Sequence, residues 1–102
     1  MLHLIAIITA KPGQRETVLA AFAANVPAVH AEAGCLEYTA TVDAAGFDDM
    51  QATLGPDTFI VVEKWASPEA LRAHAASPHM AAYGEKTKNL LAARALHILS
   101  PV

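Results

Sequence analysis

Residues 58–80 read TFIVVEKWASPEALRAHAASPHM, and this stretch carries the strongest fold signals in the chain. Thr58–Ala66 is rich in β-branched and aromatic residues, which predicts a strand with one face formed by Phe59, Val61, Glu63 and Trp65. Two Ser-Pro pairs follow, beginning at Ser67 and Ser77. A capping serine with proline at the first helical position marks a helix start, so two short helices are predicted in series, over about 68–76 and 78–91.

Upstream of this stretch, a strand pattern is followed by a helix pattern. Leu2–Ala10 is almost continuously apolar and rich in β-branched residues, which predicts a central strand covered on both faces. The segment from Gln14 to about Glu32 has one apolar stripe at helical spacing, formed by Val18, Phe22, Val26 and Val29. Pro27 lies within this stripe and is expected to bend the helix or to end its first section.

Three further segments complete the pattern. Cys35–Val42 is predicted to be a strand, with one face formed by Leu36, Tyr38, Ala40 and Val42. An acidic connection then covers residues 43–57, where the helical spacing within 47–54 predicts a short amphipathic helix or an ordered flap. A last strand is predicted over Arg94–Leu99.

The resulting order is strand, helix, strand, connection, strand, two helices and strand, which is typical of the ferredoxin-like split βαβ arrangement. We therefore expect one α+β domain over residues 1–102, with an antiparallel sheet and helices on one face. The chain is 54% hydrophobic and only 17% charged, so the open sheet face is expected to pair with a second copy and bury residues such as Leu36 and Leu96. The 23 alanines would leave room beneath the covering helices for a flat ligand.

Composition argues against several classes of protein. The apolar runs are far shorter than the roughly 20 residues of a membrane span, and the N-terminus lacks the pattern of a secretory signal. A single cysteine, Cys35, excludes a disulfide framework and a cysteine-based metal site, and a free thiol fits the cytoplasm. The net charge is −3 and the Lys and Arg residues are scattered, which argues against a nucleic-acid partner.

Two motifs point to a known family. The pattern E-x-G-C-x-x-Y occupies Glu32–Tyr38, and the pattern E-x-W-x-S…H-x-x-S-P-H-M occupies Glu63–Met80. Together they resemble the antibiotic biosynthesis monooxygenase family, and most closely its small bacterial quinol monooxygenases. The resemblance extends over essentially the whole chain and is weakest in the connection at 47–54.

The resemblance implies a homodimeric α+β barrel that oxidises an electron-rich aromatic with O2 and without a bound cofactor. The substrate would be a quinol or a related phenol, which is deprotonated and then gives an electron to O2 itself. Such chemistry needs a dry apolar pocket, a base, and hydrogen bonds that fix the phenolic oxygens.

Glu63 and Trp65 are the first candidates for this site, because they share one face of a predicted strand. A carboxylate within a strand is costly to bury unless it is paired, so Glu63 either forms a structural ion pair or orients a histidine. Trp65 is either a core aromatic or, as the resemblance implies, a wall of the pocket.

His74 and His79 are the candidate bases, and the sequence does not rank them. His74 lies on the apolar face of its predicted helix, where a histidine is more often a core residue. His79 lies at a helix start, where the helix dipole disfavours the charged imidazolium. Because the two are five positions apart with Pro78 between them, they give little support for a metal site, and none is predicted.

Four further residues are expected to line the site: Tyr38, Tyr83, Phe22 and Met80. The tyrosines either fill the core or donate hydrogen bonds to substrate oxygens, and Arg72 and Arg94 are expected at the solvent or the dimer rim. Three other functions compete with quinol oxidation: haem binding and degradation, aromatic-ligand binding without turnover, and isomerisation of a small phosphorylated ligand. The last would need a basic anchor in the pocket, which the sequence does not reveal.

Overall fold

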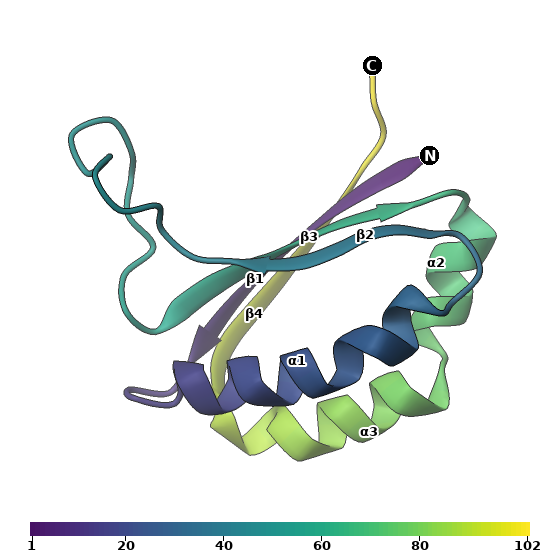
Figure 1. Ribbon diagram of the computed structural model, residues 1–102, viewed down its shortest axis with the longest axis horizontal. Helices are drawn as coiled ribbons and strands as arrows, with labels where there is room; N and C mark the ends of the chain where they lie inside the picture. The colour runs from purple at the N-terminus through teal and green to yellow at the C-terminus, as the bar shows by residue number, and fades with distance from the viewer.

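The chain folds into one antiparallel sheet with the order β2-β3-β1-β4 and a layer of helices on one face (Figure 1). The computed structural model describes all of residues 1–102. Its elements are β1 (Leu2–Ala10), α1 (Arg15–His30), β2 (Cys35–Thr41), β3 (Thr58–Trp65), α2 (Pro68–Ala75), α3 (Pro78–Thr87), a 3-10 turn (Lys88–Leu90) and β4 (Leu91–Leu99). This is the predicted ferredoxin-like α+β fold. No helix is both long enough and apolar enough to cross a bilayer.

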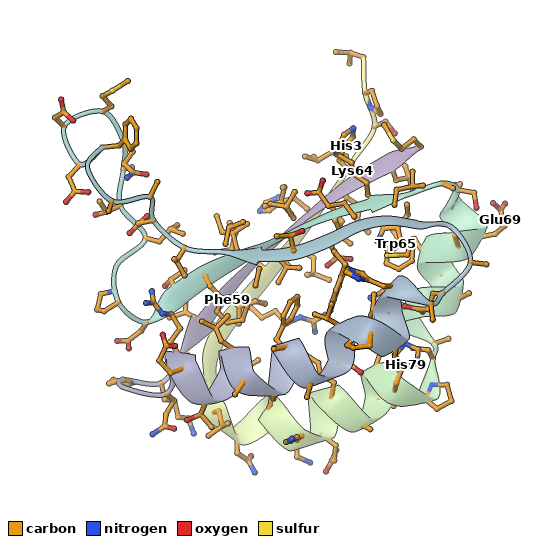
Figure 2. All side chains as sticks on the ribbon, viewed as in Figure 1. His3, Phe59, Lys64, Trp65, Glu69 and His79 are labelled. Carbon is orange, nitrogen blue, oxygen red and sulfur yellow. The ribbon has the colours of Figure 1, made fainter.

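The core lies between the sheet and α1. Alternate residues of β1 and β3 face the helices and are buried, among them Ala6, Phe59, Val61 and Trp65. From the helix side, Val18, Phe22 and Val29 are buried against them, as the apolar stripe predicts. Figure 2 shows Phe59 and Trp65 between the sheet and α1. The helix continues through Pro27 to His30, so the proline does not end its first section.

Serine caps start both short helices, as predicted. The hydroxyl of Ser67 accepts a hydrogen bond from the amide of Ala70 at 3.1 Å, and that of Ser77 accepts from the amide of Met80 at 3.4 Å. The prediction that the second helix extends to residue 91 was wrong, because α3 ends at Thr87 and β4 already begins at Leu91. Leu91 belongs to the sheet because it pairs with Ala10 of β1.

A bulge in β2 corrects the predicted faces of this strand. Cys35 pairs with Trp65 and Glu37 pairs with Lys64, so Leu36 is an extra residue without a cross-strand partner. Leu36 is therefore 58% exposed and does not share the face of Tyr38. Beyond the bulge, alternation resumes and the side chain of Tyr38 is buried beneath the helices.

The connection between β2 and β3 contains no helix, contrary to one of its two predicted forms. It consists of turns that project away from the sheet (Figure 1). At its base, the carboxylate of Asp43 accepts hydrogen bonds from the amides of Leu54, at 2.9 Å, and Gly55, at 3.1 Å. These hydrogen bonds hold the two ends of the connection together. Helix propensity alone is too weak to make so short a segment helical.

The sheet face opposite the helices is partly open in the single chain. Its centre is apolar, with Ile5, Ile7, Ile60 and Val62, and Figure 2 shows His3 and Lys64 on this side. The prediction that Leu96 lies on this face was wrong. Leu96 pairs with Ala6, so its side chain points to the helix side, where α2 and α3 leave β4 uncovered.

Candidate active site

A cavity of about 630 Å³ lies between the sheet and the helices, on the side of β4. The floor is formed by β1 and β4, including Leu4, Ala6 and Leu96. Small residues of α2 and α3 face it, among them Ala75, Ala81 and Gly84. The expected space beneath alanine-rich helices is therefore present, and it has the size and the mostly apolar lining of a small-molecule site.

Four candidate residues line this cavity together: Phe22, Tyr38, Met80 and Tyr83. The rings of Phe22 and Tyr38 stack with centroids 4.8 Å apart, and Tyr83 meets Phe22 edge-on. Burial raises the pKa of both tyrosine phenols above the usual value. Both therefore stay protonated at neutral pH and can donate a hydrogen bond to an oxygen atom in the cavity.

His74 is buried between two carboxylates and also lines the cavity. Its Nδ1 lies 2.7 Å from Oε2 of Glu32, a hydrogen bond, and its Nε2 lies 4.0 Å from Oε1 of Glu63. In the neutral imidazole, a proton on Nδ1 donates to Glu32 and leaves the lone pair on Nε2. This arrangement matches a general base oriented by a carboxylate.

Glu63 reaches the cavity wall from β3, where it is 5% exposed. Burial raises the pKa of its carboxyl group, and the negative charge of Glu32 adds to this effect. A hydrogen bond from Trp65 and the positive charges of His74 and Arg94 act in the opposite direction. Desolvation dominates, so Glu63 holds its proton to a higher pH than an exposed glutamate does.

Trp65 lies behind the cavity lining rather than in it. Its side chain is completely buried, its Nε1 donates to Oε1 of Glu63 at 3.0 Å, and its ring is 4.4 Å from that of His74. The indole thus touches both candidate acid–base residues and fixes their positions.

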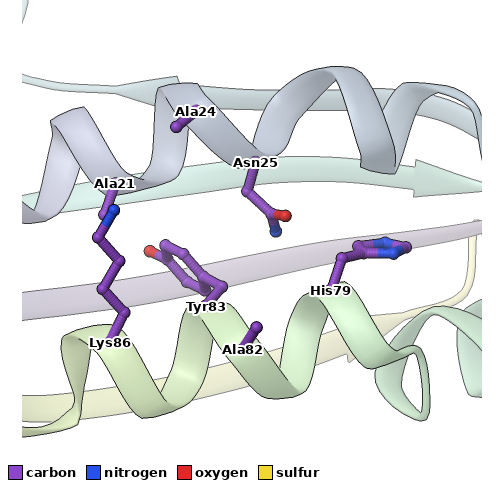
Figure 3. Close-up of a pocket in the computed structure, with 7 residues that line it drawn as sticks. All are labelled: Ala21, Ala24, Asn25, His79, Ala82, Tyr83 and Lys86. Atoms are coloured by element: carbon purple, nitrogen blue, oxygen red, sulfur yellow. The ribbon is translucent and has the colours of Figure 1, made fainter.

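His79 lies close to the same cluster but opens onto a different cavity. Its Nε2 is 3.4 Å from Oε2 of Glu32 and 3.2 Å from the hydroxyl of Ser77. His79 is one of the residues that line a smaller cavity of about 200 Å³ between α1 and α3 (Figure 3). The fold therefore brings both candidate histidines to one carboxylate, but only His74 lines the larger cavity.

Glu32, which contacts both histidines, is not among the site residues that the sequence predicts. It belongs to the E-x-G-C-x-x-Y motif, and that motif is the signal that could have identified it. Gly34, with φ +82°, turns the chain from α1 into β2 and lets this turn approach Ala70 of α2. That close approach brings Glu32 to His74. Arg94, which was expected at the solvent or the dimer rim, is exposed in the single chain and also lines the cavity from β4.

The comparison with known proteins identifies the family. The sequence model of the antibiotic biosynthesis monooxygenase family matches residues 1–86. The chain belongs to this family. It is 41% identical over 103 residues to the protein named Probable quinol monooxygenase YgiN of Escherichia coli K12, covering 99% of this chain and 98% of that protein.

Solved structures share this fold. The crystal structure of PA3566 from Pseudomonas aeruginosa is similar at 30% identity, with a TM-score of 0.82 over 99% of this chain and 93% of that one. The structure of Rv0793 from Mycobacterium tuberculosis is similar at 26% identity, with a TM-score of 0.80 over 99% and 94%. Family membership and the fold thus support a monooxygenase.

Proposed function

We propose that this chain oxidises a quinol, or a closely related phenol, with O2 and without a bound cofactor. The observation that carries the proposal is the position of His74, which is held by Glu32 and borders an apolar cavity lined with tyrosines. The printed name of the Escherichia coli relative supports the same substrate class.

The first step is removal of the phenolic proton of the quinol. Nε2 of His74 accepts it, while the Nδ1 proton remains hydrogen-bonded to Glu32. The imidazolium that results stays hydrogen-bonded to Glu32, whose negative charge stabilises it. In this role Glu32 is a positioning residue, and Trp65 supports the site by holding Glu63.

The quinolate then supplies the electrons. One electron passes from the quinolate to O2, which gives a semiquinone and superoxide. Their recombination at carbon, followed by loss of water, yields a hydroxyquinone, so that quinol plus O2 becomes hydroxyquinone plus water. Tyr38, Tyr83 and Arg94 line the cavity, where they can donate hydrogen bonds to the substrate oxygens.

Oxygen uptake with a chemically reduced naphthoquinol tests this proposal. The wild-type chain should accelerate consumption over autoxidation, and His74→Gln should lower the rate by about 10²- to 10⁴-fold, as loss of a general base does. Glu32→Gln should also lower it, because an amide cannot stabilise the imidazolium as a carboxylate does. Glu69→Gln, at an exposed position of α2, is the matched control. Quinone binding without acceleration would refute the enzyme and favour ligand binding alone.

We also propose that two chains pair through the open sheet face, as the family resemblance implies. The apolar centre at Ile5, Ile7, Ile60 and Val62 supports this pairing, since the helices cover the opposite face and these four side chains remain partly exposed. Light scattering during gel filtration measures the mass of the assembly, and a single-chain mass at micromolar concentration would contradict the proposal.

A further inference from the structure

Glu32, His74 and His79 form a cluster of three metal-ligand side chains, although they come from three different segments. Oε2 of Glu32, Nδ1 of His74 and Nε2 of His79 all lie within 4.8 Å of one another. The carboxylate oxygen is 2.7 Å from the first nitrogen and 3.4 Å from the second, so one oxygen atom lies close to both rings.

We propose that these three residues bind one divalent transition-metal ion of the zinc class. Zinc takes imidazole nitrogen and carboxylate oxygen at about 2.0–2.2 Å, which places neighbouring ligand atoms of a tetrahedral site about 3.4 Å apart. The Glu32–His79 distance already has this value. The Glu32–His74 contact must lengthen by about 0.7 Å, which a rotation of the glutamate side chain can supply. The two histidine nitrogens, which lie within 4.8 Å of each other, must reach the same spacing. Two histidines and one glutamate are a ligand set that zinc uses elsewhere with water in its fourth position.

The surroundings of His74 provide a second, independent observation. A histidine that binds a metal through one nitrogen usually donates the proton of its other nitrogen to a carboxylate, a backbone carbonyl or water. Nε2 of His74 faces Glu63 at 4.0 Å, and Trp65 holds this carboxylate by its own hydrogen bond. A carboxylate therefore lies beside the nitrogen that a bound ion would leave free, about 1 Å beyond hydrogen-bond distance.

An ion can also reach the cluster. The side chain of His79 is 29% exposed and that of Glu32 is 14% exposed, whereas His74 is nearly covered. Imidazole nitrogens favour zinc and its transition-metal neighbours over Mg²⁺ or Ca²⁺, which prefer oxygen ligands. The selected ion therefore belongs to the first-row transition series.

Metal binding would exclude the proposed base function of His74. An ion on Nδ1 requires the imidazole proton to sit on Nε2, which is the nitrogen that would accept the quinol proton. Zinc would thus inhibit quinol oxidation. The binding site itself does not depend on the proposed activity, so the test below uses metal binding as its main measurement.

The experiment begins with the full chain, freed of metal with EDTA and then dialysed. Calorimetric titration with ZnCl2 should show one ion bound per chain. Titration with CoCl2 should give the visible absorption of low-symmetry, four- or five-coordinate Co²⁺ and should quench the fluorescence of Trp65, whose ring is 4.4 Å from that of His74. Absence of a bound ion, or a Co²⁺ spectrum identical to that of the ion in buffer, would overturn the proposal.

Three variants locate the ion. His79→Ala and Glu32→Gln each remove one ligand and should weaken binding at least about 100-fold, which is the upper end of the loss caused by removing an outer partner. His3→Ala removes a histidine on the open sheet face and should leave the affinity unchanged. Circular dichroism confirms that each variant is folded. Equal affinity in His79→Ala and the wild-type chain, or a loss in His3→Ala, would place the ion elsewhere and overturn the proposal.

Discussion

Gly34→Ala should be among the most destabilising single-methyl changes in this chain. Gly34 has φ +82°, where a residue with a side chain pays about 1–2 kcal/mol. An added Cβ would also lie 2.6 Å from the Cβ of Ala70, inside van der Waals contact. Relief of this overlap costs about 1–3 kcal/mol. The two costs sum to about 2–5 kcal/mol, a large part of the stability of a small domain.

Gly13→Ala is the matched control for this substitution. Gly13 has φ +77°, and an added Cβ there meets no atom within 4 Å. Both substitutions share the backbone cost and the change in the unfolded chain, so the difference between them measures the overlap with Ala70. Gly34→Ala should therefore cost about 1–3 kcal/mol more than Gly13→Ala.

Urea unfolding, followed by circular dichroism and by the fluorescence of Trp65, measures these differences at one fixed protein concentration. A double variant sharpens the test, because Ala70→Gly removes the atom that the new methyl group would strike. Gly34→Ala combined with Ala70→Gly should be more stable than the sum of the two single effects predicts. Equal costs for Gly34→Ala and Gly13→Ala, or strict additivity in the double variant, would refute the reasoning.

Two further predictions concern Glu63 and Asp43. Burial raises the pKa of Glu63 in the folded chain, so between the ordinary carboxyl pKa and this raised value the folded state holds a proton that the unfolded state has lost. Glu63 therefore makes the free energy of unfolding fall as pH rises through that window, and Glu63→Gln should remove this fall. Urea titrations at several pH values, with EDTA present, measure the free energy of unfolding. An unchanged pH dependence in Glu63→Gln would contradict the raised pKa of Glu63. Asp43→Ala should speed protease cleavage within residues 43–57, because it removes the hydrogen-bond acceptor of the Leu54 and Gly55 amides. Asp48→Ala is the control and should leave the cleavage rate unchanged. Equal cleavage rates in the two variants would show that Asp43 does not hold this connection.

Local sequence patterns predicted most of the elements and their faces. The alternation along β3 correctly placed Phe59, Val61, Glu63 and Trp65 on one buried face, because side-chain direction in a strand follows from the two-residue period alone. The serine caps of α2 and α3 were equally local, since each hydroxyl bonds to an amide three residues away.

The errors arose where distant parts of the chain meet. Leu36 was assigned to the wrong face because a bulge depends on the register between β2 and β3. The end of α3 was misplaced because the pairing of Leu91 with Ala10 competes with the helix for the same residues. The connection at 43–57 forms turns rather than the short helix that was one of its two predicted forms, and Asp43 holds amides more than ten residues away.

The candidate site divides in the same way. The sequence by itself determined that His74 lies on a buried helix face, that Glu63 and Trp65 share a strand face, and that aromatic residues accompany them, because each property follows from the period of one element. Only the tertiary structure decided which carboxylate binds His74. Glu32 is 42 positions away in the sequence, and it reaches the histidine because Gly34 lets the end of α1 pack closely against α2. The periodicity of a single element carries no information about such a contact, which depends on how the elements pack against one another.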